Sequence, residues 1–266
     1  MIDIMKKILS LAVFLFLFIN HSHGADIPDN SIYGGLLQEY VQGVKVDLSG
    51  LCKDKRLGQY VDALAKADPD KMAMDDQQLA FWINAYNAYN LKAVCDRYPV
   101  DSMIKLGTGP LVVQAAFGKT VWDKPIAIIH GKKYTLKNID HGVIRGRFHD
   151  PKIQFALYCG AVSCPSLRNE PYEAARLRSQ LTEQAAVFFG NVQWNSFDLK
   201  SKTATLSSIM NWNARYFGTD HDAILRFIAG FAPADVRDSL SRETSKWSIK
   251  YNSYDLTIND IKRMKN

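Results

Sequence analysis

The sequence lacks the features of several common classes of protein. Beyond its first residues, no apolar run approaches the roughly 18 residues that a transmembrane helix needs. There is no internal repeat, no low-complexity segment and no linker rich in proline, glycine or serine. A chain of 266 residues with 47% hydrophobic composition is long enough to bury one large core. We therefore expect a single globular domain.

Charge of one sign is not concentrated anywhere in the chain. Lysine and arginine number 33 against 27 acidic residues, and no basic block is longer than a pair. This distribution argues against a nucleic-acid partner, whereas mild basicity suits an anionic cell-envelope surface. The histidines show no H-E-x-x-H spacing, so we predict no cofactor and no resident metal.

The first residues have the pattern of an export signal. Lysines precede the apolar run Ile8–Ile19, and Ser22 and Gly24 follow at the spacing that signal peptidase prefers. We predict a signal peptide over residues 1–24 and one globular domain over residues 25–266. The mature protein is then periplasmic or secreted, with no stable membrane insertion after cleavage.

The chain has only four cysteines, and in an oxidising compartment these allow three fully paired connectivities. If all are structural, we expect Cys52 to pair with Cys95 and Cys159 with Cys164. The rival is one bridge and two free thiols. The sequence does not choose between these alternatives.

Apolar periodicity predicts a helix-rich α+β domain with a small antiparallel sheet. The expected helices are Leu48–Asp68, Asp75–Arg97, Leu136–Phe148, a long helix with Pro171 in its first turn, Ser207–Phe217 and His221–Phe231. The expected strands are Pro125–Ile129, His130–Thr135, Ile153–Tyr158, Thr203–Leu206 and Trp247–Tyr254.

Cys159 stands at the end of an apolar run and is followed by small residues that would let a substrate approach. A thiol attacks as thiolate, and a neighbouring imidazole such as His141 could activate it. Asp140 is poorly placed to orient that ring, because the side chains of neighbouring residues on a helix point about 100° apart. Asn84 or Asn87 could supply the orienting oxygen instead. All of these side chains also have a structural explanation in packing or in satisfying backbone groups.

Three further positions would complete a site of this kind. Backbone N–H groups from Gly160 to Ser163 would stabilise an oxyanion, and Arg168 would hold an anionic group of the substrate. An arginine at such a position is more commonly exposed to solvent and binds no ligand.

Several blocks of sequence occur together in a recognisable order. They are Phe81–Ala88, Asn138–Arg145, Asp150-Pro151 and Phe155–Arg168. In this order they resemble the domain-of-unknown-function family numbered 547, which occurs in bacteria and plants. The resemblance covers about residues 47–231, with a fainter echo at Tyr254-Asp255.

The resemblance implies a papain-like or transglutaminase-like cysteine enzyme in outline, with its order permuted. It makes Cys159 and His141 the suspected pair and Asn84 a candidate third member. The chain departs from the usual pattern in having Asp140 for glutamate, Tyr158 for asparagine and Leu256 for tryptophan.

Three hypotheses follow. The leading one is an exported cysteine-dependent enzyme that hydrolyses or transfers an amide or peptide bond of an envelope peptide or protein. The second is a non-catalytic binding or scaffold protein in which Cys159 and Cys164 form a structural disulfide. The third is a zinc protein that uses the same thiols and a histidine. A free-thiol count separates the first two.

Overall fold

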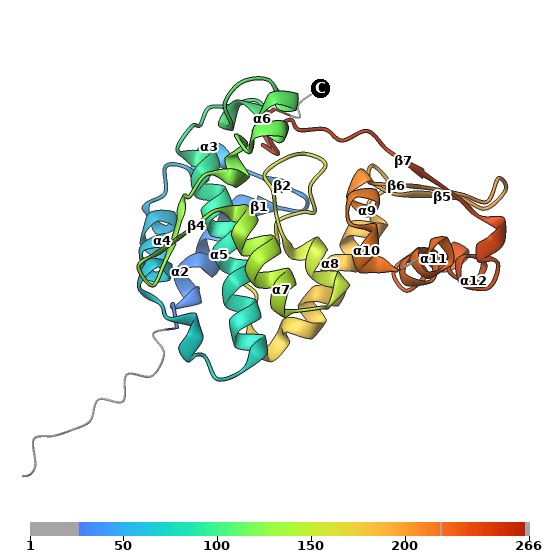
Figure 1. Cartoon of the computed structure of the whole chain (residues 1–266), viewed down its shortest axis with the longest axis horizontal. Coiled ribbons are helices and arrows are strands. Elements are labelled where there is room, and N and C mark those ends of the chain that lie inside the picture. Colours follow the sequence, from blue (N-terminus) through green and yellow to red (C-terminus); the bar gives the residue numbers. More distant parts are fainter. Residues whose placement is uncertain (1–26, 219, 264–266) are drawn as a thin grey trace, which may run out of the picture.

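The computed structural model describes residues 27–218 and 220–263, so the predicted signal peptide lies outside the described residues. The chain forms a helix-rich α+β domain with three small sheets, which confirms the predicted class (Figure 1). Across the described ranges, no helix combines the length and the apolar character needed to cross a membrane.

The larger part of the molecule is built around one helix, α5 (Asp75–Cys95). Its side chains are buried without interruption from Gln78 to Leu91, as expected for a helix enclosed on all sides. Helix α4 (Lys55–Lys66) packs directly on α5. Helix α2 (Asn30–Tyr40) packs on α4 and contacts α3 (Leu48–Leu51), and it leads into the short hairpin of β1 (Val41–Gln42) and β2 (Lys45–Val46).

The helix predicted over Leu48–Asp68 is broken into α3 and α4. Asp54 causes the restart, because its carboxylate accepts the backbone N–H of Arg56 at 2.9 Å and caps α4. Cys52 lies at this break and forms a disulfide with Cys95 at the end of α5. This disulfide links the break between α3 and α4 covalently to the end of the central helix.

The predicted hairpin in the middle of the chain is confirmed as β3 (Ala127–Ile129) and β4 (Lys132–Tyr134). Its turn consists of His130 and Gly131, both with positive φ (47° and 71°), the conformation of a tight two-residue hairpin turn. A helix with wide, π-type turns (Asn138–Ile144) and α7 (Arg145–Arg147) follow.

The strand predicted over Ile153–Tyr158 is wrong, because Pro151–Ala156 forms a 3-10 helix. Asp150 caps this helix through the N–H of Lys152, and Pro151 fits its first position. The backbone groups that a strand would pair in a ladder are taken by asparagine side chains of α5 instead. The apolar run reflects burial rather than strand pairing.

The C-terminal third has its own hydrophobic cluster. Its helices are α8 (Leu177–Gly190), α9 (Ser208–Trp212), α10 (Ala214–Phe217), α11 (His221–Ala229) and α12 (Ala234–Arg242), and its strands are β5 (Ser196–Asp198), β6 (Thr203–Leu206) and β7 (Ser248–Tyr251). Except for α8, near the centre, these helices and strands lie at the right of Figure 1. Strand β6 pairs antiparallel with β5 but parallel with β7, so this sheet is mixed. The expected start of α8 at Pro171 is too early, because only a 3-10 turn at Ala174–Arg176 precedes Leu177.

After β7 the chain runs back across the molecule to the larger part, over residues 252–260 (Figure 1). It pairs on the way with Ala161, through Ile258, and with Ser102, through Thr257. This return segment brings Tyr254 against both hydrophobic clusters. The remaining 3-10 helices are Pro69–Lys71, Met103–Leu106, Val121–Asp123 and Thr244–Lys246, and α6 spans Leu111–Phe117.

Candidate functional site

A cavity of about 550 Å³ lies where α5, α6, the wide-turned helix, α9 and the return segment meet. A volume of this size is in the range of small-ligand and peptide pockets. Three of the predicted site residues, Cys159, His141 and Asp140, line it. The structure therefore brings together residues that the sequence placed about twenty positions apart.

Aromatic and aliphatic side chains form much of the cavity wall. Trp122 lines it from the segment after α6, and Trp212 lines it from α9. The ring of Trp212 packs 4.8 Å, centroid to centroid, from that of Tyr254. Leu256, the position where the resembling family usually has tryptophan, is also a lining residue.

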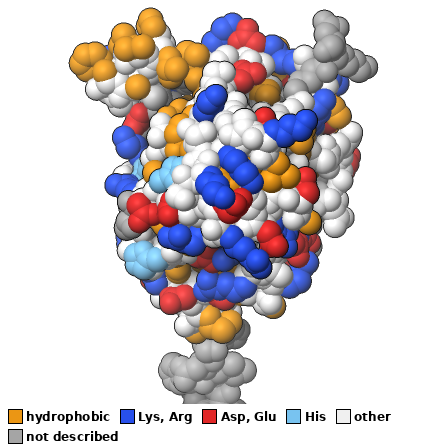
Figure 2. Space-filling view, turned by 90° about the vertical axis from the view of Figure 1, so that its right-hand side faces the viewer, with side chains coloured by type: hydrophobic (Ala, Val, Ile, Leu, Met, Phe, Trp, Pro, Cys, Tyr) orange, Lys and Arg blue, Asp and Glu red, His pale blue; other side chains and the backbone are white. Residues whose placement is uncertain are grey.

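Helix α6 forms a rim of the cavity and is oriented unusually. Its polar residue, Gln114, is buried and donates to the backbone oxygens of Ile104 (2.8 Å) and Gly109. The apolar side chains consequently face outward, with Val112 80% exposed. Figure 2 shows hydrophobic side chains gathered on the projecting part of the molecule where α6 lies. Leu111 and Ala115 line the cavity from this helix.

The wide turns of Asn138–Ile144 determine what Asp140 binds. In π-type turns the backbone bonds span five residues, and here the N–H of Arg145 donates to the carbonyl of Asp140. The same spacing lets the Arg145 guanidinium donate to the Asp140 carboxylate at 2.6 Å. Arg145 also donates to Gln154 and stacks 4.3 Å from the ring of Tyr216. Asp140 is thus held primarily by Arg145.

His141 lines the cavity, and about half of its side chain is exposed (47%). Its Nε2 lies 3.8 Å from the Asp140 carboxylate, which is beyond hydrogen-bond distance. This geometry agrees with the expectation that Asp140 is poorly placed to orient the His141 ring. A half-exposed imidazole in a cavity can still donate to, or accept from, a bound molecule.

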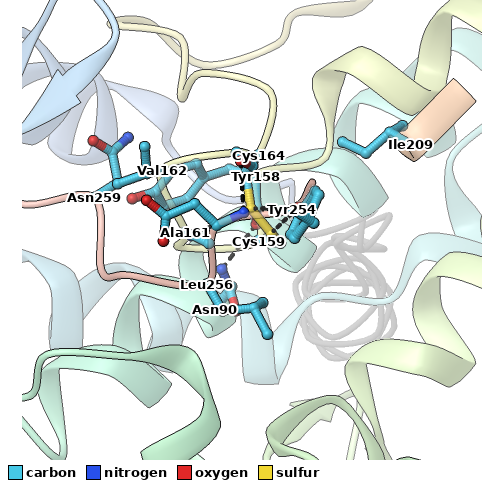
Figure 3. Close-up of a disulfide and its surroundings, with 12 residues drawn as sticks. Asn90, Tyr158, Cys159, Ala161, Val162, Cys164, Ile209, Tyr254, Leu256 and Asn259 are labelled. Atoms are coloured by element: carbon cyan, nitrogen blue, oxygen red, sulfur yellow. Dashed lines mark hydrogen bonds between the residues drawn. A yellow bond between two sulfur atoms is a disulfide. The ribbon is translucent and has the colours of Figure 1, made fainter. Parts of the chain in front are cut away.

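Cys159 is bonded to Cys164, and Cys52 to Cys95, so none of the four cysteines is a free thiol (Figure 3). The pairing is the one expected if all four cysteines are structural. Because both sulfurs of the second bridge are used, they cannot serve as zinc thiolates in this state. Among the described residues, no cluster of three or more His, Cys, Asp or Glu side chains is arranged to hold a metal.

The loop that carries Cys159 is fixed from α5. Asn87 accepts the N–H of Tyr158 at 2.8 Å and donates to the carbonyl of Ala156, while Asn90 donates to the carbonyl of Tyr158 at 2.8 Å. Gly160 then turns the chain with φ of 92°. These contacts place Cys159 at the wall of the cavity and Cys164 in the interior, where it is fully buried.

Tyr254 lies against both sulfurs of this disulfide (Figure 3). Its hydroxyl oxygen is 3.2 Å from Sγ of Cys159 and 3.3 Å from Sγ of Cys164. Burial raises the pKa of Tyr254 well above its usual range, so the hydroxyl stays protonated and able to donate at neutral pH.

Other predicted site residues lie outside the cavity lining. Asn84 pairs with the backbone of Tyr172, accepting its N–H at 2.9 Å and donating to its carbonyl at 2.8 Å. Arg168 binds the carboxylates of Glu170 and Glu183. Both therefore stabilise the packing of the segment before α8.

The expected oxyanion donors from Gly160 to Ser163 are largely occupied. The N–H of Ala161 faces Sγ of Cys164 at 3.2 Å, and the N–H of Val162 donates to Thr257 at 2.8 Å. The N–H of Ser163 donates to Asp255, and the Ser163 hydroxyl accepts the N–H of Asp255. At most the Gly160 N–H is left for an oxyanion.

Sequence reasoning missed several residues that line the cavity or bind its lining residues. Arg145 stood inside a recognised block, but only the wide turns reveal its pairing with Asp140. The weak family similarity at Tyr254-Asp255 points to Tyr254. Nothing in the sequence indicates that its hydroxyl contacts Cys159, 95 positions earlier. Trp122 and Leu111 carried no signal beyond their apolar character.

Residues 69–189 match the model of a family described as a protein of unknown function, DUF547. This match supports the resemblance seen in the sequence blocks and covers α5, the wide-turned helix and the disulfide loop. Trp212 and Tyr254, which complete the cavity, lie outside the matched segment. Neither the curated proteins nor the solved structures include a match to the chain.

Proposed function

We propose that the cavity binds a peptide-like ligand and that the protein is a binding protein of the cell envelope, periplasmic or secreted. The observation that carries the proposal is the cavity of about 550 Å³ with its mixed lining. The disulfide between Cys159 and Cys164 favours this function over catalysis by a thiolate, because a bonded sulfur is not a nucleophile.

The lining suits a ligand with apolar side chains and a polar backbone. Trp122 and Trp212 offer aromatic surface, and aromatic groups supply much of the binding energy in such pockets. The charged groups are already paired, Asp140 with Arg145 and Asp123 with Lys137 at 3.3 Å. A neutral peptide segment can therefore enter without leaving a buried charge unmatched.

Binding can be tested with acetylated tripeptide amides that carry one phenylalanine, followed through the intrinsic fluorescence of the five tryptophans, of which Trp122 and Trp212 line the cavity. We expect saturable binding that Leu111→Asp weakens at least about tenfold, since a charge placed in the cavity rim must be desolvated. Val112→Asp, on the exposed side of the same helix, is the matched control and should leave affinity unchanged. Equal loss in both variants, or no saturation at millimolar peptide, contradicts the proposal.

One observation favours a second function, a cysteine-dependent enzyme that hydrolyses or transfers an amide bond. Cys159, His141 and Asp140 line the same cavity, and the resemblance to papain-like enzymes in permuted order belongs with this alternative. It requires that the disulfide be reduced. The occupied backbone donors around Val162 and Ser163 weigh against it.

The alternative has its own test. After reduction, the alkylation rate of Cys159 by iodoacetamide should fall several-fold in His141→Ala if the imidazole assists ionisation of the thiol. His221→Ala is a matched control, because that ring is also about half exposed (43%) and lies beside an aspartate. An unchanged rate and pH profile in His141→Ala excludes the pair.

A further inference from the structure

We infer that Cys159–Cys164 is a thiol-exchange disulfide: a thiol compound that enters the cavity attacks Sγ of Cys159, and Cys164 is the leaving group. This activity goes beyond ligand binding and does not depend on it. The inference comes from the unequal surroundings of the two sulfurs (Figure 3).

The first difference is access. Cys159 is partly exposed and lines the cavity, whereas Cys164 is fully buried. Thiol–disulfide exchange needs an approach to one sulfur along the bond, so attack is directed to Cys159. The cavity provides the room for the attacking thiolate.

The second difference is the stabilisation of the leaving thiolate. Sγ of Cys164 faces two donors, the N–H of Ala161 at 3.2 Å and the hydroxyl of Tyr254 at 3.3 Å. Sγ of Cys159 faces only the Tyr254 hydroxyl, at 3.2 Å, among the interactions of the described residues. Hydrogen bonds to the charged form lower the pKa of a thiol, and a thiol of lower pKa leaves faster.

The third observation concerns the loop that the bridge closes. Cys159 and Cys164 are separated by 5 positions, against 43 for Cys52 and Cys95. A short loop restricts the unfolded chain less, so this bridge contributes less to stability than the other. The shorter loop is thus compatible with a role in addition to stabilisation.

The exchange step balances in atoms and electrons. The incoming thiolate forms a bond to Sγ of Cys159, the bond between Cys159 and Cys164 breaks, and its electron pair remains on Cys164 as a thiolate held by Ala161 and Tyr254. The products are a mixed disulfide at Cys159 and a reduced Cys164, and no other oxidant or reductant takes part.

The test exposes the purified, oxidised protein to reduced glutathione and quenches it with excess N-ethylmaleimide, followed by peptide mass mapping. We expect the Cys159–Cys164 bridge to open at least about tenfold faster than Cys52–Cys95. In the trapped mixed disulfide, glutathione should be on Cys159 and maleimide on Cys164. Equal opening rates of the two bridges, or glutathione found mainly on Cys164, would overturn the inference.

A variant separates exchange chemistry from simple accessibility. Tyr254→Phe keeps the ring but removes the donor, and should slow opening of the bridge at least about threefold. Tyr251→Phe, a partly exposed position on β7, is the control and should open at the wild-type rate. An unchanged rate in Tyr254→Phe overturns the assignment of Cys164 as a stabilised leaving group. Peptide binding measured on the same variants reports separately on the proposed function.

Discussion

Gly160 determines how the disulfide loop leaves Cys159. Its φ is 92°, and a Cβ at this position would lie 2.8 Å from the sulfur of the buried Met103. Gly160→Ala should lower the free energy of unfolding by about 2–4 kcal/mol, from backbone strain and overpacking together. Urea unfolding measures this loss.

Gly131→Ala is the matched control for Gly160→Ala. Its φ is also positive (71°), but no atom lies within 4 Å of the added Cβ. Only the backbone strain remains, so the expected loss is about 1 kcal/mol. If both variants lose the same amount, contact with Met103 has no part in the effect.

Asn87 supports the same loop from α5. Asn87→Ala would leave the N–H of Tyr158 and the carbonyl of Ala156 without their partners in the interior. Leaving two buried polar groups unpaired should cost about 2–4 kcal/mol of unfolding free energy. Asn211→Ala, at an exposed position on α9, should change it by less than about 0.5 kcal/mol. Thermal or urea unfolding of both variants measures these losses, and equal losses would contradict the role given to Asn87.

At the residue scale, the sequence predicts which residues carry chemistry better than which partners they meet. The sequence predicts Cys159, His141 and Asp140 as candidate site residues, and all three line one cavity. The same reasoning predicts Asn84 as a site residue, but its side chain binds the backbone of Tyr172 instead. The types of the side chains were visible, whereas the partners depend on long-range packing that periodicity does not encode.

At the scale of elements, apolar periodicity predicted the long helices best. The predicted helix from Asp75 to Arg97 corresponds to α5, and the one from His221 to Phe231 to α11. Periodicity failed at Ile153–Tyr158, where polar side chains of α5 satisfy the backbone in place of a neighbouring strand. An apolar run indicates burial, and only the partners of its backbone groups decide its conformation.

The two disulfides should differ in what they contribute to stability. On chain entropy, the bridge between Cys52 and Cys95, with 43 residues of separation, contributes about 4 kcal/mol. The bridge between Cys159 and Cys164, with 5, contributes about 2 kcal/mol. Urea unfolding of the two double-serine variants tests this. A larger loss from removing the short bridge would show that its role is chiefly structural.

At the scale of the whole molecule, Glu170 in the ion-pair network before α8 contributes to stability in acid. Partial burial would raise the pKa of Glu170, but hydrogen bonds from Gln180, Arg168 and Arg176 outweigh it and lower this pKa to about 2. A carboxyl whose pKa is depressed by folding stabilises the folded state above its unfolded value of 4.5. That stabilisation is lost as the pH falls from about 4.5 to about 2.

Glu170→Gln should therefore lower the unfolding free energy by on the order of 2 kcal/mol at pH 7, and the difference from wild type should shrink as the pH approaches 2. Glu173→Gln is the control, because its side chain is about half exposed (46%) and, among the described residues, its carboxylate forms an ion pair with Arg176 alone. Chemical unfolding across this pH range gives both curves. A difference for Glu170→Gln that does not depend on pH would exclude the carboxylate as the cause.

The return segment supplies one wall of the cavity. It carries Tyr254 and Leu256 from β7 to the disulfide loop and joins the two hydrophobic clusters. Composition and length predicted one helix-rich domain, but the late strand pattern around Trp247–Tyr254 did not indicate that the chain doubles back. Such a closure depends on contacts between distant residues, which local patterns do not report.

The central claim, that this cavity is the binding site, is tested most directly by photo-crosslinking. A tripeptide amide carrying benzoylphenylalanine would be irradiated with the oxidised protein, and the modified residues mapped by mass spectrometry. We predict cross-links to the lining residues Leu111, Trp212 and Leu256, with none on Val192, which is exposed and is not a lining residue. Cross-links that lie outside the cavity, or that spread evenly over the surface, would contradict the account.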